Sequence, residues 1–220
     1  MKLLLTSGGL TNESISKALF ELVGKKPEDT SLVFIPTASN VETEEKDWLI
    51  NDLININKQN FKEIYIADIS AVPEDIWRPQ FEKADVLFFE GGNTGYLMRW
   101  INKSGLIKFL PEMLKTKVYV GLSAGSMVTC PDIALRMSQI IYDDDEREKE
   151  LLQALGFVDF YFLPHLNSPN FPKRMEETIK KAVDELQIKR KVYALDDQSA
   201  LKVVDGRVEV VSEGKYLEFN

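Results

Sequence analysis

Short, continuous apolar runs recur along this 220-residue chain, and most are followed by a segment with helical spacing of its apolar residues. A run that is apolar throughout, rather than at every second residue, is typical of a strand buried on both faces. Such strands alternating with helices predict a mainly parallel central sheet between two helical layers, a three-layer α/β/α fold. The predicted strands lie within residues 2–5, 31–39, 62–69, 84–94, 117–128, 157–166 and 191–197.

Helices and turns complete the pattern. The spacing predicts helices over residues 13–24, 42–58, 95–105, 146–157 and 172–188, and a C-terminal β-hairpin over 199–211 turning at Asp205-Gly206. No linker, repeat or low-complexity segment interrupts the chain, so residues 1–220 are expected to form a single α/β domain.

Charge and cysteine content exclude several classes of protein. A net charge of −8 disfavours nucleic-acid and anionic-membrane partners, which reward clustered Lys and Arg. Cys130 is the one cysteine, so an intrachain disulfide and a thiolate zinc cluster are excluded. No apolar run is long enough for a signal peptide or a membrane span, and we expect a cytoplasmic protein.

The segment "VYVGLSAGSMV", residues 118–128, contains the pattern Gly121-x-Ser123-x-Gly125 directly after an apolar run. This pattern is typical of a nucleophile elbow, a tight strand-to-helix turn that lifts a serine hydroxyl out of the sheet. The turn also places Ser123 at a helix N-terminus, where the Ala124 N–H can donate to an oxyanion. Glycine-rich turns of this kind also serve close packing or phosphate binding.

A serine nucleophile needs a base, and the chain contains one histidine, His165, in "FLPHLNS". A lone histidine is often structural, but this one ends a predicted strand, where the reactive groups of such sheets lie. Asp197 in "ALDDQSAL" is our preferred partner to orient the imidazole. Its neighbour Asp196, and Asp159 on the strand before His165, remain alternatives.

The segment "FFEGGNTGY" is the third unusual strand end. Gly91 and Gly92 leave backbone N–H groups uncovered, and one of them can be a second oxyanion donor. The alternative is a plain turn before a helix capped by Asn93 or Thr94, and the two roles are compatible.

Together, "EGGNT", "GLSAGSMV", "PHLNS" and "ALDDQSAL" resemble the peptidase E (aspartyl dipeptidase) and cyanophycinase family of serine peptidases. The resemblance implies a fold like the class I glutamine amidotransferase domain. It implies Ser123 as nucleophile, His165 as base, and an oxyanion hole of Gly92 and Ala124. The order Ser123, His165, Asp197 differs from that of α/β-hydrolases, in which the acid precedes the histidine. Asp159 would restore that order.

The resemblance implies a small peptide as substrate, and Asn93, Thr94, Arg174 and Met175 as candidate substrate-binding residues. An acidic side chain would need a cation, and Lys173 and Arg174 are available, although Met175 falls where the family carries arginine. Arg174 as a solvated residue at a helix start is the alternative, and a pocket for a medium apolar side chain is another.

The expected function is therefore a serine peptidase that works through an acyl-enzyme. An amidase or esterase with the same groups, and a non-catalytic binding protein on this fold, are the rivals. The sequence implies no metal and no organic cofactor, because no cluster of ligands has the required spacing. It leaves a homodimer open.

Overall fold

The computed structural model describes residues 1–132 and 153–220. The larger part of the helix predicted over 146–157 lies outside the described residues. Its described end, residues 153–157, is not helical.

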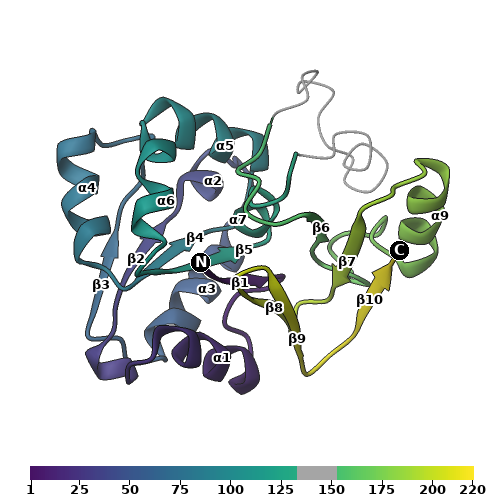
Figure 1. Ribbon diagram of the computed structural model, residues 1–220, viewed down its shortest axis with the longest axis horizontal. Coiled ribbons are helices and arrows are strands. Elements are labelled where there is room, and N and C mark those ends of the chain that lie inside the picture. Colours follow the sequence, from purple (N-terminus) through teal and green to yellow (C-terminus); the bar gives the residue numbers. More distant parts are fainter. Residues whose placement is uncertain (133–152) are drawn as a thin grey trace.

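A seven-stranded sheet forms the centre of the molecule (Figure 1), with the strand order β3-β2-β4-β5-β1-β8-β9. Its first five strands are parallel, and the hairpin β8–β9 continues the sheet in antiparallel fashion beside β1. This confirms the predicted mainly parallel sheet and the C-terminal hairpin. The strands are β1 Lys2–Thr6, β2 Ser31–Ile35, β3 Glu63–Ile66, β4 Val86–Phe89, β5 Val118–Leu122, β8 Ser199–Val204 and β9 Arg207–Ser212.

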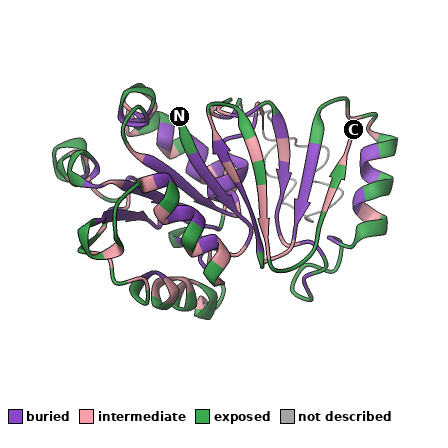
Figure 2. Cartoon of the chain, turned by 60° about the horizontal axis from the view of Figure 1, so that its bottom comes forward, coloured by how far each residue is buried: buried purple, intermediate pink, exposed green. Residues whose placement is uncertain are grey.

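Helices cover both faces of this sheet, which explains why its inner strands β2, β4, β5 and most of β1 are apolar and buried. Successive residues of β1 alternate between faces: Leu4 packs with one cluster of buried side chains, while Leu3 and Leu5 pack with the other. The Leu4 face is covered by α1 (Glu13–Val23) and α3 (Asp47–Asn57), and the opposite face by α4 (Glu74–Lys83), α5 (Thr94–Lys103) and α6 (Leu110–Met113). In Figure 2 buried residues follow the strands, and exposed residues lie on the outer sides of the helices.

Short helical turns complete the described chain. These are α2 (Thr37–Asn40), α7 (Ala124–Met127), and the 3-10 turns η1 (Pro27–Asp29) and η2 (Leu106–Lys108). None of the helices within residues 1–132 and 153–220 is long and apolar enough to cross a membrane. The helix predicted over 42–58 starts later, at Asp47, because residues 41–46 form a turn and extended chain instead.

A second, three-stranded sheet lies to the right in Figure 1, with the order β10-β7-β6. It consists of β6 (Phe160–Leu163), β7 (Lys191–Leu195) and β10 (Tyr216–Phe219), and α9 (Glu176–Glu185) packs on it through a separate apolar cluster. Apolar periodicity predicted β6 and β7, but not their separation from the central sheet. The strand β10 was not predicted.

The topology brings several strand ends together. In the parallel ladder Thr6 pairs with Leu122, and Phe89 pairs with Gly121. The residues that follow β1, β4 and β5 therefore emerge side by side at one edge of the sheet, as expected for a parallel arrangement.

Candidate active site

The turn after β5 is a tight elbow. Ser123 has a φ of 47°, a left-handed conformation that is strained for a residue with a side chain. A Cβ on Gly121 would lie 2.5 Å from the Ser126 nitrogen, and one on Gly125 would overlap with the Phe89 carbonyl. Both glycines of the motif are therefore required by the close approach of the chain to itself and to β4.

Hydrogen bonds to neighbouring strands hold this elbow. The Ser123 N–H donates to the Thr6 carbonyl over 3.0 Å, and the Ser126 hydroxyl donates to the same oxygen over 2.9 Å. The buried Tyr119 hydroxyl donates to the Gly125 carbonyl over 2.6 Å. Because strand backbone and a buried phenol fix the turn, the Ser123 hydroxyl is presented in one position.

The structure brings Ser123, His165 and Asp197 together. His165 follows β6 in a left-handed conformation, with a φ of 64°. Its Nε2 lies 2.9 Å from the Ser123 hydroxyl, and its Nδ1 lies 2.6 Å from Oδ1 of Asp197. A carboxylate can only accept, so Nδ1 carries the proton and Nε2 is left to accept from the serine hydroxyl.

The two alternative carboxylates lie elsewhere. Asp159 forms an ion pair with Arg190 over 2.7 Å, and its side chain is 89% exposed. Asp196 accepts from the Ser199 hydroxyl over 2.6 Å and from the Gln198 and Lys215 N–H groups. Asp196 thus fixes the loop around the hairpin, and Asp197 is the member of the pair that points at the imidazole.

Ser7 is a member of this hydrogen-bond network that sequence reasoning missed. Its hydroxyl donates to Oδ1 of Asp197 over 2.9 Å and accepts from the His165 backbone N–H over 2.7 Å. Ser7 therefore joins the ends of β1, β6 and β7. The segment "TSGG" carries a signal for a site residue, because it places a polar side chain and two glycines at the end of the first strand.

The electrostatics suit a neutral imidazole. Burial lowers the pKa of His165, and the charge of Arg174 lowers it further. Asp197 raises that pKa, but the net shift is downward. Burial by itself would raise the pKa of Asp197. The hydrogen bonds from His165 and Ser7, with the charges of His165 and Arg174, outweigh it and hold that pKa below its ordinary value. At neutral pH the arrangement is a carboxylate beside an uncharged imidazole.

The glycine turn after β4 lies against the elbow. A Cβ on Gly91 would be 3.5 Å from the Ser123 Cβ. Gly92 has a φ of 121°, and a side chain there would collide with the Ala38 carbonyl, so the position requires glycine. Within the described residues, the N–H groups of Gly92 and Ala124 donate to no protein acceptor.

The candidate substrate-binding residues are arranged unevenly. Asn93 caps α5, since its Oδ1 accepts from the Tyr96 N–H over 2.8 Å, and Thr94 is 3.9 Å from the Met127 sulfur. Met175 is 46% exposed. Arg174 is only 5% exposed and precedes α9, so the alternative of a solvated residue at a helix start is wrong.

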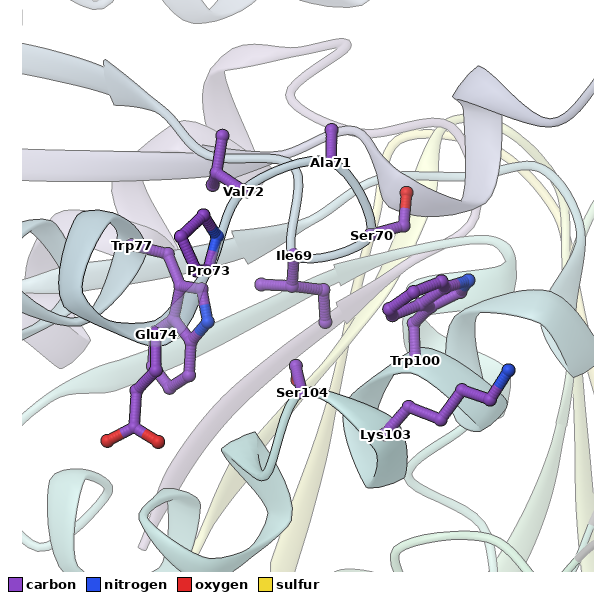
Figure 3. Close-up of a pocket in the computed structure, with 10 residues that line it drawn as sticks. All are labelled: Ile69, Ser70, Ala71, Val72, Pro73, Glu74, Trp77, Trp100, Lys103 and Ser104. Carbon is purple, nitrogen blue, oxygen red and sulfur yellow. The ribbon is translucent and has the colours of Figure 1, made fainter.

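Other places in the described chain offer less chemistry. Residues 1–132 and 153–220 contain no group of three or more His, Cys, Asp or Glu side chains placed to hold a metal ion. A cavity of about 340 Å³ lies between α4 and α5, with Trp77 and Glu74 on one side and Trp100 and Lys103 on the other (Figure 3). It is lined by none of the residues around Ser123.

Comparison with known proteins fits this geometry. Residues 3–211 match the sequence profile of peptidase family S51. The chain belongs to this family. It is thus a peptidase, and its membership of this family supports a serine peptidase.

Individual relatives of this S51 peptidase agree with the family match. An uncharacterized peptidase of Pasteurella multocida is 29% identical over 180 residues, which are 80% of this chain and 82% of the relative. Peptidase E of Salmonella gallinarum is 26% identical over 135 residues, which are 61% of this chain and 53% of that protein.

Solved structures show the same fold. A crystal structure of a candidate peptidase E from Listeria monocytogenes has a TM-score of 0.77 and 26% identity, covering 97% of this chain and 98% of that one. A peptidase from an acI-B1 Actinobacterium has a TM-score of 0.71 at 20% identity, covering 98% of this chain and 88% of that one.

Proposed function

We propose that this S51 peptidase hydrolyses small peptides through a Ser123-His165-Asp197 triad. The observation that carries the proposal is the continuous line of hydrogen bonds from the Ser123 hydroxyl through both imidazole nitrogens to Asp197. His165 takes the serine proton at Nε2 as the hydroxyl oxygen attacks the scissile carbonyl, and later gives it to the leaving amine. Water then hydrolyses the acyl-enzyme by the same proton transfers in reverse order.

The oxyanion of the tetrahedral intermediate is expected to lie between the N–H groups of Gly92 and Ala124. Support comes from the contact of the glycine turn with the elbow and from the absence of protein acceptors for these two donors in the described residues. Backbone donors fixed in advance stabilise the charge that develops in the transition state without reorganising.

We propose an apolar rather than an acidic preference for the residue before the scissile bond. Phe171, 36% exposed, stacks on His165, and the exposed Met175 follows nearby in the chain. Arg174, the cation that an acidic residue would use, is buried against the ring of Phe171. Asn93 and Thr94 are proposed to contact the substrate from the opposite side, at the start of α5.

Labelling by a fluorophosphonate tests the mechanism. The wild-type protein is expected to be labelled at Ser123, and the Ser123→Ala variant is expected to lose labelling and peptide hydrolysis. The Ser104→Ala variant, which changes a serine at the end of α5, is the control and should be labelled like the wild type. Absence of labelling in the wild-type protein would favour a non-catalytic protein on this fold.

A panel of fluorogenic peptides that differ only in the residue before the scissile bond tests the specificity. We expect cleavage after Leu, Met or Phe, and none by the Ser123→Ala variant. Cleavage after Asp alone would overturn the apolar preference and leave the serine mechanism in place. Turnover of esters without turnover of any peptide would instead identify an esterase.

Replacing Ser7 by Ala is expected to lower kcat/KM about tenfold. The change removes one hydrogen bond to Asp197 and one acceptor for the His165 N–H, each of which contributes about 1 kcal/mol. Steady-state kinetics with the best peptide of the panel measure the effect. The variant should still react with the fluorophosphonate, and unchanged kcat/KM would show that Ser7 has no part in positioning the imidazole.

A further inference from the structure

The imidazole of the candidate triad belongs to a stack of three planar groups, in which the Phe171 ring contacts both His165 and Arg174. The rings of His165 and Phe171 are 4.7 Å apart between centroids and inclined by only 21°. The guanidinium carbon of Arg174 lies 3.8 Å from the centroid of the same Phe171 ring. Phe171 is thus in contact with the imidazole and with a buried cation.

The loop that carries these residues is folded on itself. The Arg174 N–H donates to the Phe171 carbonyl over 2.9 Å, and the Asn167 N–H donates to the Arg174 carbonyl over 2.9 Å. The Arg174 guanidinium reaches back to the Pro164 carbonyl over 3.4 Å. Arg174 therefore contacts the loop of residues 164–174 both directly before His165, at Pro164, and after it, at Asn167 and Phe171.

This segment needs such support, because His165 is in a left-handed conformation. A residue with a side chain keeps that conformation only where its surroundings impose it, at a cost on the order of 1–3 kcal/mol. Stacking between an arginine and an aromatic ring is favourable, and more so when the cation is shielded from water, as the Arg174 side chain is here.

The cation also acts on the charged groups around it. Burial is the largest influence on the pKa of His165 and lowers it; among the charged groups of the described residues, Asp197 raises that pKa and Arg174 lowers it. Arg174 also lowers the pKa of Asp197, and Asp52 lies beyond Asp197 and is affected by its charge. A cation at this place adds to the effect of burial on the imidazole and to the effect of His165 and Ser7 on the carboxylate.

The geometry points to Arg174 as a positioning residue, which holds Phe171 against the His165 imidazole, and not as a cation that binds substrate. The inference rests on the proposed function for its effect on catalysis. Phe171 transmits the contact and at the same time presents its open edge to the substrate. Arginine is suited to this role because its guanidinium is planar and stacks, whereas lysine supplies a point charge.

The experiment compares Arg174→Met, Arg174→Lys and Phe171→Leu with the control Arg207→Met, which removes an exposed charge on β9. His165 is the one histidine in the chain, so NMR titration of its ring in tag-free protein reports its pKa without any need for activity. We expect that pKa to rise in Arg174→Met, since a nearby positive charge has been removed. Arg174→Lys and Arg207→Met should leave it close to the wild-type value.

Kinetics give the second readout. Arg174→Met is expected to lower kcat about tenfold with little change in KM and to move the acid limb of the kcat/KM profile to higher pH. Phe171→Leu is expected to lower kcat by a similar factor and, because Phe171 also faces the substrate, to raise KM. Arg174→Lys keeps the charge but not the stack, so it should lower kcat without moving that limb. A rise in KM alone, or an unchanged His165 titration with unchanged kcat, would overturn the inference.

The two proposals can fail separately. If the wild-type protein does not react with the fluorophosphonate, the proposed function fails, while the His165 titration still tests the contact with Arg174. Circular dichroism on each variant identifies any that does not fold, and Phe171→Leu, which keeps an apolar side chain, then carries the kinetic test.

Discussion

Replacing Asp197 by Asn is expected to lower kcat about 10⁴-fold while leaving the fold intact. Oδ1 of Asp197 accepts from His165 Nδ1 over 2.6 Å and from the Ser7 hydroxyl over 2.9 Å. An amide in that place can turn its NH₂ group toward Nδ1, which moves the imidazole proton to Nε2. There it blocks acceptance of the Ser123 proton, so the base is present in the wrong tautomer. Steady-state hydrolysis of the best fluorogenic peptide, with circular dichroism as a check of folding, measures the loss.

Asp159→Asn is the matched control, since Asp159 pairs with Arg190 at the surface and was the rival for the same role. Its activity should stay within about twofold of the wild type, because an exposed ion pair contributes at most about 1 kcal/mol to stability. Loss of activity in Asp159→Asn with retention in Asp197→Asn would contradict the proposed triad and restore the order of groups found in α/β-hydrolases.

Local sequence signals were sufficient to predict the elements around the candidate site. The elbow at Gly121-x-Ser123-x-Gly125 is a local motif, because both glycines are demanded by contacts within a few residues or with the adjacent strand. His165 could be predicted as the candidate base because it is the one histidine in the chain and ends an apolar run. Asp197 was preferred over Asp196 on neighbouring residues alone, and the structure points Asp197 at the imidazole.

Long-range contacts were not predictable in the same way. The apolar spacing predicts that "KRM" lies at the start of a helix. No local signal shows that Arg174 is buried against Phe171 before α9 begins. Periodicity also does not specify which sheet a strand joins, so the separate sheet of β6, β7 and β10 was missed. Ser7 acts through partners 158 and 190 residues away, and only the rule about strand ends could have drawn attention to it.

A second feature that sequence reasoning missed is a pair of carboxyl groups beneath the site. Glu90 follows β4 and is fully buried, close enough to Asp52 of α3 for the Asp52 charge to act on its carboxyl group. Asp52 lies against Gly9, while the adjacent Gly8 lies against Asp197, so this turn separates the pair from the candidate triad. Two carboxylates this close in a buried place repel each other, so one of the pair is expected to carry a proton.

The pKa values of the pair imply a stability that falls as the pH rises. Burial raises the pKa of Asp52 to about 7 from 3.8, and burial with the charge of Asp52 raises the pKa of Glu90 well above 4.5. Below about pH 4 Asp52 is protonated in both the folded and the unfolded chain, and its contribution is fully present. Above that pH the unfolded chain ionises first, so stability is lost until the pH passes about 7. The Asp52 shift corresponds to a loss of up to about 4 kcal/mol.

The change in the free energy of unfolding that Asp52→Asn causes relative to the wild type is therefore expected to be more favourable at pH 8 than at pH 4.5. The difference between the two pH values should be on the order of 3 kcal/mol. The amide does not ionise, and its NH₂ group can donate to the Glu90 carboxylate, so the buried charge gains a partner instead of a competitor. Urea denaturation at both pH values measures the free energy of unfolding. Glu90→Gln should act in the same direction, and Asp75→Asn, which changes an exposed residue of α4, should lose stability between the two pH values as the wild type does. If Asp52→Asn instead destabilises the protein equally at both pH values, Asp52 is already ionised in the folded state at pH 4.5 and its pKa is not raised.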